Sequence, residues 1–450
     1  MRWAERAKKR LPPDAMSSTP SRSTSTACWA RSGAWCGRAS TRWLADYLRD
    51  GLFNHGLTLT FFAIRIQPYA IEDTQCEAVR VTFCAMKRRD IRALITGAGI
   101  GASGNLIRAL RAMPSKPYIV GVNDDRFLIK LSLADRNYLC PKPASSDYVD
   151  TILEIIRRER INVVIPTEDN VVKVLSDARV RFPLELLLPR KRTIDLCQDK
   201  YALNVFLRDR AISAPFTHEV GSLRDLDRIF ARFSRAGVLW CRSRHGARSL
   251  GATPVATAAQ ARAWITQWRD LRGLKVSDFT LSEYLPGRHF IVHSVWRNGG
   301  LLRAQSIEVL SYFAAGNNPS GIFSLACLAK TVNASSPLEV ALSAVRALER
   351  HPSGAFSVEL KESATGVPSI TEINAGRFPA GVTALLAVGK DNMVAVFASA
   401  ALGRTISVGE PHGSAQEHYL VRDIDAVPGV FSATDLLEGI WRVPLSSATE

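Results

Sequence analysis

The pattern of apolar residues after residue 90 predicts a parallel sheet with helices between its strands. Continuous apolar runs alternate there with amphipathic segments. Such runs are typical of strands that are covered on both faces, and apolar residues three or four apart are typical of helices. The expected strands are 91–99, 117–125 and 161–169, and the expected helices are 104–113 and 147–160.

Beyond residue 196 the pattern changes and predicts a second unit of the α+β class. Helices and strands occur in separate runs, and most strands alternate apolar with polar residues, as antiparallel strands do. The expected helices are 199–212, 222–234, 257–268 and about 337–350. The expected strands are 237–243, 279–285, 288–299, 301–310, 355–361 and 368–374.

The first 85 residues differ from the rest of the chain. They contain the polar run "SSTPSRSTST" and four of the eight cysteines, and they show no strand–helix alternation. Met86 is followed by a short basic segment and a buried strand, as at a natural protein start. We predict a poorly structured N-terminal extension, with a misassigned start as its explanation and an Arg- and Ser-rich transit peptide as the alternative. The predicted divisions are 1–88 extension, 89–195 parallel-sheet domain, 196–405 second domain and 406–450 C-terminal segment with a strand or two.

Charge and cysteine content narrow the class of protein. The net charge of +16 is spread along the chain, with +5 in residues 1–85 and +11 in the other 365 residues. This scatter favours a solvated surface or anionic small molecules over nucleic acid as a partner. No apolar run approaches the roughly 18 residues of a membrane span. The eight cysteines form no CxxC pair, which is typical of reduced thiols in a cytoplasmic protein.

The first expected strand leads into a glycine-rich turn, "GIGASG", at residues 99–104. It satisfies G-x-G-x-x-G, and Asp124 and Asp125 follow at the end of the second strand, about 20 residues on, as in dinucleotide-binding folds. Any tight turn between a strand and a helix also favours glycine. A nicotinamide-dependent oxidoreductase is therefore one alternative.

The last two expected strands predict a hairpin with paired carboxylates. With the loop "ATGV", Glu359 faces Glu372 and Lys361 faces Ile370. Asn374 shares a face with Glu372 because strand side chains alternate. Two opposed carboxylates repel, so a cation is expected between them, and Mg²⁺ prefers such oxygen ligands. A solvent-facing polar edge, or a one-residue slip that separates the acids, is the alternative.

Two cations stand where they could hold a polyphosphate. Lys200 opens a helix, and Arg242 ends a strand just before the flexible segment "SRHGARSLGA". A cation next to mobile backbone amides is a common phosphate site. Either residue alone is more often ordinary surface charge.

Taken together, these motifs resemble the ATP-grasp superfamily, in the branch of the ATP-binding half of the carbamoyl-phosphate synthase large subunit. The resemblance covers residues 90–405. The segments that carry it are "LITGAGIGASGNLIRALR", "VVIPTEDNVVKVLS", "DKYALNVFLRDRAISAP", "VLWCRSRHGARSLGA", "SEYLPGRHF" and "VELKESATGVPSITEINAGRF". It implies a Rossmann-like pre-ATP-grasp sheet followed by a two-subdomain ATP-grasp fold. It also implies that the sheet with the glycine turn carries substrate contacts and binds no nicotinamide.

The resemblance assigns roles by position. It implies that two cations bind phosphates under a glycine loop, that a hinge binds adenine, and that a histidine binds ribose. The implied ATP-binding residues are Lys200, Arg242, Gly246, Ser249, Gly251, Glu283, Tyr284, Leu285 and His289. The implied metal ligands are Glu359, Glu372 and Asn374, for Mg²⁺ with Mn²⁺ as an alternative. Arg377 and Arg242 are the implied catalytic residues.

The implied activity is that of a carboxylate–amine ligase that uses ATP and Mg²⁺. Its substrates would be a small-molecule carboxylate and amine, and a homodimer is compatible with this assignment. The chain departs from the family pattern in two places. Ser243 follows Arg242 where many members have proline. Arg303 stands beside Gln305 and Glu308 in a strand where more basic residues are expected. A non-catalytic ATP-binding regulator is therefore a further alternative.

Overall fold

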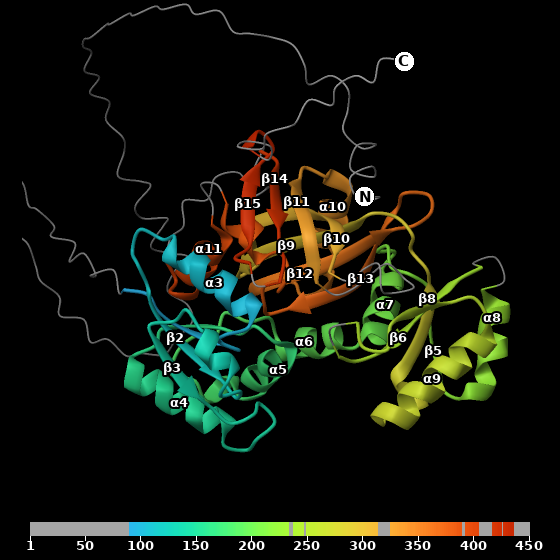
Figure 1. Ribbon diagram of the computed structural model, residues 1–450, viewed down its shortest axis with the longest axis horizontal. Helices are drawn as coiled ribbons and strands as arrows, with labels where there is room; N and C mark the ends of the chain where they lie inside the picture. Colours follow the sequence, from blue (N-terminus) through green and yellow to red (C-terminus); the bar gives the residue numbers. More distant parts are fainter. Residues whose placement is uncertain are drawn as a thin grey trace, which may run out of the picture. The chain divides into compact units, whose positions relative to one another are not determined.

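The computed structural model describes residues 90–233, 237–246, 249–313, 325–388, 392–404, 416–424 and 426–435 (Figure 1). All the described residues belong to one compact unit. The predicted extension 1–88 lies outside the described residues.

The first sheet is parallel, with the strand order β3-β2-β1-β4. Its strands are β1 (Arg92–Thr96), β2 (Tyr118–Asn123), β3 (Arg136–Leu139) and β4 (Val163–Ile165), and its helices are α3 (Gly101–Arg111), α4 (Tyr148–Glu159) and α5 (Asp169–Asp177). Leu106 of α3 packs with Ile95 of β1, whereas Ile152 of α4 packs with Leu94 on the other face. The prediction of a parallel sheet covered on both faces is therefore confirmed, and β3 and α5 are additional to it.

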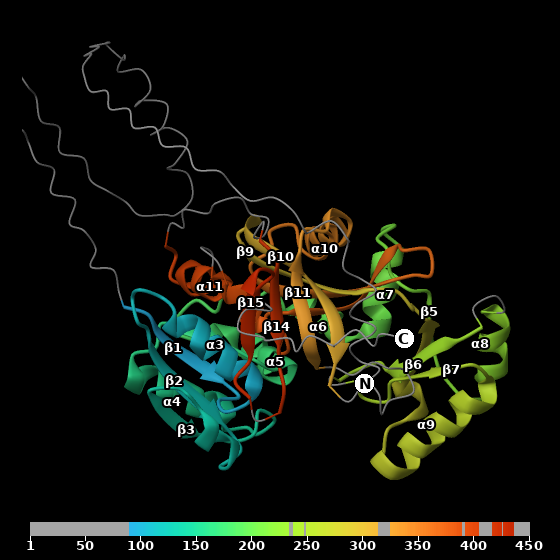
Figure 2. The same cartoon turned by 45° about the horizontal axis from the view of Figure 1, so that its top comes forward.

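A second, small sheet is antiparallel, with the order β5-β8-β6-β7. Its strands are β5 (Thr217–Glu219), β6 (Leu239–Ser243), β7 (Thr253–Val255) and β8 (Phe279–Glu283), and its helices are α8 (Leu226–Arg232) and α9 (Ala258–Arg272). Both helices pack on this sheet through one apolar cluster (Figure 2). Helix α9 begins where the Thr257 hydroxyl accepts a hydrogen bond from the Gln260 N–H, and it ends at Gly273 in the left-handed conformation.

The large sheet has seven antiparallel strands in the order β13-β12-β9-β10-β11-β14-β15. They are β9 (His289–Arg297), β10 (Gly300–Tyr312), β11 (Ala326–Val332), β12 (Gly354–Glu362), β13 (Pro368–Ala375), β14 (His418–Val421) and β15 (Gly429–Ser432). Helix α10 (Ser335–Leu348) packs on one face and α11 (Met393–Ala401) on the other. The strands expected near the C-terminus are β14 and β15, and they extend this sheet beyond β11.

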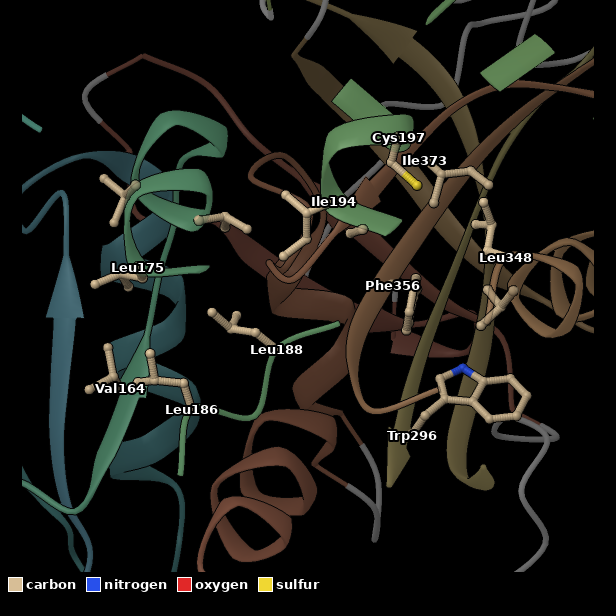
Figure 3. Packing of buried hydrophobic residues seen from close by; sticks show 14 of the residues in the cluster. Val164, Leu175, Leu186, Leu188, Ile194, Cys197, Trp296, Leu348, Phe356 and Ile373 are labelled. Carbon is tan, nitrogen blue, oxygen red and sulfur yellow. The ribbon is translucent and has the colours of Figure 1, made fainter. Parts of the chain in front are cut away.

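One apolar cluster joins the parallel sheet to the large sheet. Figure 3 shows Val164 and Leu175 on one side, Phe356 and Trp296 on the other, and Leu188 between them. The chain then continues into α6 (Lys191–Gln198) and α7 (Lys200–Arg208). Short 3₁₀ helices are η1 (Leu128–Leu131), η2 (Arg179–Arg181), η3 (Leu223–Asp225), η4 (Val276–Asp278) and η6 (Thr383–Ala387). The two sheets therefore share one apolar core.

The predicted combination of an α/β sheet with a following α+β unit is confirmed. In the part of the chain that the structure describes, no helix combines the length and apolar character that crossing a bilayer requires.

Candidate functional site

A cleft lies where the small sheet faces the large sheet, and most of the predicted site residues meet there. Ten of the thirteen line it, and Gly251, Asn374 and Arg377 do not. The lining residues are Lys200, Pro215, Trp240, Arg242, Ser243, Gly246, Ser249, Leu250, Ala252, Ser282, Glu283, Tyr284, Leu285, His289, Tyr312, Glu359, Lys361, Thr371 and Glu372.

Lys200 is placed in the cleft by the start of α7. The Asp199 carboxylate caps this helix by accepting hydrogen bonds from the N–H groups of Tyr201 and Ala202 at 3.1 and 3.0 Å. The Lys200 N–H donates to the Arg244 carbonyl, which ties the helix start to the end of β6. Its ammonium donates to the Gly246 carbonyl at 2.6 Å and lies 3.6 Å from a Glu372 oxygen. The cation therefore stands between the glycine loop and the acidic strand pair.

Arg242 depends on a β-bulge that the sequence interpretation missed. Glu359 pairs with Glu372 as predicted, but Leu360 then pairs with Ile370, so Thr371 is left over as a bulge. Lys361 consequently faces Ser369, and its predicted pairing with Ile370 is wrong.

The bulge turns the Thr371 carbonyl toward the cleft, where it accepts a hydrogen bond from Arg242 Nη2 at 2.8 Å. Arg242 is 8% exposed. Burial lowers the pKa of its guanidinium, and the charges of Glu372 and Glu359 partly offset this. Within the described residues its buried Nε has no acceptor. Arg242 is thus a buried cation with donor capacity left for a ligand.

The two carboxylates of the hairpin are held together by an amide. Asn374 Nδ2 donates to Glu359 Oε1 at 3.3 Å and to Glu372 Oε1 at 3.4 Å. Burial by itself raises the pKa of Glu359, but His289, Arg377 and Lys200 bring it below its ordinary value. Glu359 is therefore ionised at neutral pH, which is the form that a metal ion binds.

Arg377 lies behind the carboxylates and is held by a residue that the sequence interpretation missed. Its Nε and Nη2 donate to the two carboxylate oxygens of Asp169 at 2.5 and 3.0 Å, and Nη2 also donates to Asn374 Oδ1 at 2.5 Å. Burial alone would lower the pKa of Arg377, but Asp169 raises it overall. Asp169 opens α5 of the parallel sheet, so this bridge connects the first sheet to the hairpin.

His289 contacts two groups in the cleft. Its Nδ1 lies 2.6 Å from the Tyr312 hydroxyl, and its Nε2 lies 3.6 Å from Glu359 Oε2. Burial raises the pKa of Tyr312, which therefore keeps its proton. Tyr312 was not among the predicted site residues.

The predicted hinge lines the cleft with three successive residues of β8 and the turn after it. Glu283 is held in place on both sides, since its N–H donates to the Phe216 carbonyl at 3.0 Å and its carboxylate accepts from the Phe216 N–H at 2.9 Å. Tyr284 and Trp240 have tilted rings with centroids 6.1 Å apart. Leu285 is buried. The hinge therefore presents apolar and aromatic side chains to the cleft.

Gly251 has a packing role instead of a lining role. Its φ is +63°, and a Cβ at this position would lie 2.8 Å from the Phe279 ring. Its carbonyl accepts a hydrogen bond from Trp264 Nε1 at 2.9 Å. Glycine is required here so that the loop can pack on the small sheet.

Lys361 is a cleft residue that the sequence interpretation did not select. It lies on the same face of β12 as Glu359, directly opposite His289 on β9. Burial lowers the pKa of its ammonium. Side chains two residues apart on a strand share a face, so the position of Lys361 could have been inferred from that of Glu359.

The strand with few basic residues contributes less to the cleft than expected. Arg303, Gln305 and Glu308 are buried in β10, and none of them is among the residues that line the cleft. Glu308 pairs with Phe290 and so faces the side of the sheet opposite to Glu359.

The glycine turn of the first sheet is explained by packing. Gly99 has a φ of +97°, and a Cβ there would lie 1.8 Å from the Leu128 carbonyl oxygen. The chain's own backbone therefore occupies the space that this glycine opens. The fingerprint needs no dinucleotide to account for it.

The donor set of the hairpin fits a hard divalent cation. Glu359 and Glu372 offer carboxylate oxygens on one face, and Mg²⁺ typically takes one or two carboxylates together with substrate phosphates. Asn374 Oδ1 is engaged by Arg377, so the two carboxylates are the principal donors. No group of three or more His, Cys, Asp or Glu side chains suited to a metal occurs in the described ranges.

Comparison with known proteins gives one family match, over the first sheet. Residues 94–186 match the model described as PylC-like, N-terminal domain. No curated protein matches the chain in sequence.

Solved structures resemble the chain over most of its length. The L-amino acid ligase of Bacillus licheniformis is 14% identical, with a TM-score of 0.55 over 74% of this chain and 80% of that one. Biotin carboxylase of Campylobacter jejuni, in a β-γ-ATP complex, is 12% identical, with a TM-score of 0.57 over 74% and 76%. N5-carboxyaminoimidazole synthetase of Staphylococcus aureus is 12% identical, with a TM-score of 0.54 over 74% and 82%. At these identities the likeness establishes a shared fold.

Proposed function

We propose that this chain, which has the ATP-grasp fold of those structures, is an ATP- and Mg²⁺-dependent ligase that joins a carboxylate to an amine. The observation that carries the proposal is the convergence of Lys200, Arg242, Glu359 and Glu372 in one cleft beside the Glu283–Leu285 hinge. Two cations and two carboxylates around an apolar slot suit a nucleoside triphosphate with its metal. The similar structures include an amino acid ligase and an ATP complex of a carboxylase, which supports the same chemistry.

The reaction would proceed through an acyl phosphate. A carboxylate oxygen attacks the γ-phosphorus, the bond to the bridging oxygen breaks, and ADP leaves. The amine nitrogen then attacks the acyl carbon, phosphate leaves, and the amine proton passes to solvent. Mg²⁺, when bound, supplies positive charge next to the phosphoryl oxygens.

The protein's own residues would bind and orient the reactants. Lys200 and Arg242 would contact phosphate oxygens, where donors fixed in advance stabilise developing charge. Glu359 and Glu372 would hold the metal ion. Arg377 does not line the cleft, so it would act indirectly: fixed by Asp169, it holds Asn374 beside the two carboxylates.

The finer assignments rest on the sequence. The resemblance implies the carbamoyl-phosphate synthase-like subtype, Mn²⁺ as a substitute metal and a homodimer, and the cysteine pattern favours a cytoplasmic location. A non-catalytic ATP-binding regulator is a second candidate, because neither Arg303 nor Gln305 is among the cleft-lining residues. Such a regulator would bind Mg·ATP and release no ADP with any substrate.

An ADP-release screen over carboxylic acids crossed with amines tests the ligase proposal. Wild type should release ADP only with a productive pair, and Glu372→Ala should abolish that release while the circular dichroism spectrum stays unchanged. The matched control is Glu339→Ala, which removes an exposed carboxylate on α10 and should behave as wild type. Normal ADP release by Glu372→Ala would contradict the metal assignment. Mg·ATP binding without ADP release from any pair would favour the regulator.

A further inference from the structure

A lysine lines the cleft and has no role in the proposed function. Lys361 lies on β12 two residues beyond Glu359, which is about 7 Å along a strand. It faces the cleft from the same side of the sheet as Glu359 and lies opposite His289. Its position is therefore beyond the proposed metal ligands, along the strand.

Main-chain hydrogen bonds fix Lys361 next to the hinge. The Gly287 N–H donates to the Glu362 carbonyl at 2.9 Å, and the Glu362 N–H donates to the Arg288 carbonyl at 3.0 Å. These bonds hold the end of β12 against the segment that follows the hinge. Lys361 therefore lies at the end of the cleft where a nucleobase on the hinge would sit.

The nearest acid in sequence is not available to this ammonium. Glu362 points to the other face of the strand, because successive side chains alternate. Its two oxygens accept hydrogen bonds from Arg288 Nη2 at 2.7 Å and Nε at 2.8 Å. Within the described ranges, no carboxylate or other acceptor pairs with the Lys361 ammonium.

An unpaired ammonium that is partly removed from water is unfavourable for the free protein. Lys361 is half-buried at the wall of the cleft. A bound ligand that supplies an acceptor would remove this cost. In the proposed function Lys200 and Arg242 contact the phosphates, so the ligand atoms left for Lys361 are those of the base.

We propose that the Lys361 ammonium donates a hydrogen bond to a ring nitrogen or exocyclic oxygen of the bound nucleobase and thereby contributes to nucleotide selection. This inference rests on the proposed function, since it requires a nucleoside triphosphate whose base lies at the hinge. Leu285, Trp240 and Pro215 line the same cleft and supply apolar surface for the base plane.

The test compares Lys361→Met with the matched control Lys142→Met, which removes the same charge at an exposed site outside the cleft. Binding of Mg·ATP and of magnesium tripolyphosphate, which has no base, is measured by calorimetry. Lys361→Met should weaken Mg·ATP binding about tenfold or more, the effect of losing one charge-assisted hydrogen bond. Tripolyphosphate binding should change less than about twofold, because a screened charge at that distance contributes little.

The ligand-free variant provides a second measurement. Removal of an unpaired cation should leave the melting temperature of Lys361→Met unchanged or raised, and a fall of several degrees would instead indicate a structural role. Unchanged Mg·ATP affinity, or equal losses for ATP and tripolyphosphate, would overturn the inference while the proposed function stands. Failure of wild type to bind Mg·ATP would overturn both.

Discussion

The bridge between Asp169 and Arg377 should contribute strongly to stability, and a double-mutant cycle can measure its contribution. Asp169→Ala would leave a guanidinium that is only 10% exposed without its carboxylate partner. Removing one member of a buried pair costs about 3–5 kcal/mol. The 29% exposure of Asp169 places our expectation at the lower end, about 3 kcal/mol.

The cycle consists of Asp169→Ala, Arg377→Met and the double variant, with the free energy of unfolding measured in urea. The double variant removes both members of the pair, so it should be more stable than the sum of the single losses predicts, by about 2 kcal/mol. Asp177→Ala is the control on the same helix. Its carboxylate is 42% exposed and pairs with Lys173 and Lys191, so its loss should cost less than about 1 kcal/mol. Additive single losses, or a loss below about 1 kcal/mol for Asp169→Ala, would refute the buried bridge.

Three further predictions concern groups in and near the cleft. Arg242→Met should weaken Mg·ATP binding in calorimetry at least about tenfold, because a charge-assisted donor is lost, and unchanged affinity would contradict its role. Burial by itself raises the pKa of Asp199, but Arg244 and the Ala202 N–H lower it overall. The ionised Asp199 carboxylate therefore stabilises the fold above about pH 3.9, and this stabilisation is lost as the pH falls through the lowered pKa. When the free energy of unfolding in urea is measured from pH 7 to acid pH, it should therefore fall less for Asp199→Asn than for wild type. Parallel plots of this free energy against pH for the two proteins would count against the prediction. Burial raises the pKa of Cys241 to about 12, so iodoacetamide at pH 8 should leave this thiol unlabelled in the native protein when peptides are examined by mass spectrometry.

The hairpin illustrates how far alternation along a strand can be used. The opposition of Glu359 and Glu372 is as predicted, but the count started from the loop "ATGV". Glu362 pairs with Pro368, so the observed loop is one residue longer, and the bulge at Thr371 offsets that extra residue. The bulge could not be predicted, because the Thr371 carbonyl is stabilised by Arg242, which lies 129 residues earlier in the chain. A local pattern contains no information about such a distant donor.

The first sheet also contains features that a local sequence pattern predicts and features that depend on distant residues. Its three apolar strands and two helices were predictable from periodicity. The edge strand β3 was not, because three of its four residues are exposed and supply no apolar run. The role of Asp169 also escaped prediction, since its partner Arg377 is 208 residues away. Residues that join two sheets show no periodic pattern by which the sequence alone would reveal them.

The sequence predicts where Lys361 lies, but the role of its ammonium depends on three-dimensional contacts. Its position follows from the sequence, since a residue two beyond Glu359 on a regular strand shares its face. Its role depends on whether an acid neutralises it, and Glu362 is the adjacent acid in the chain. Only the three-dimensional pairing of Glu362 with Arg288 removes that partner. The ammonium then faces the cleft without a counter-charge among the described residues, and a ligand becomes the remaining source of an acceptor.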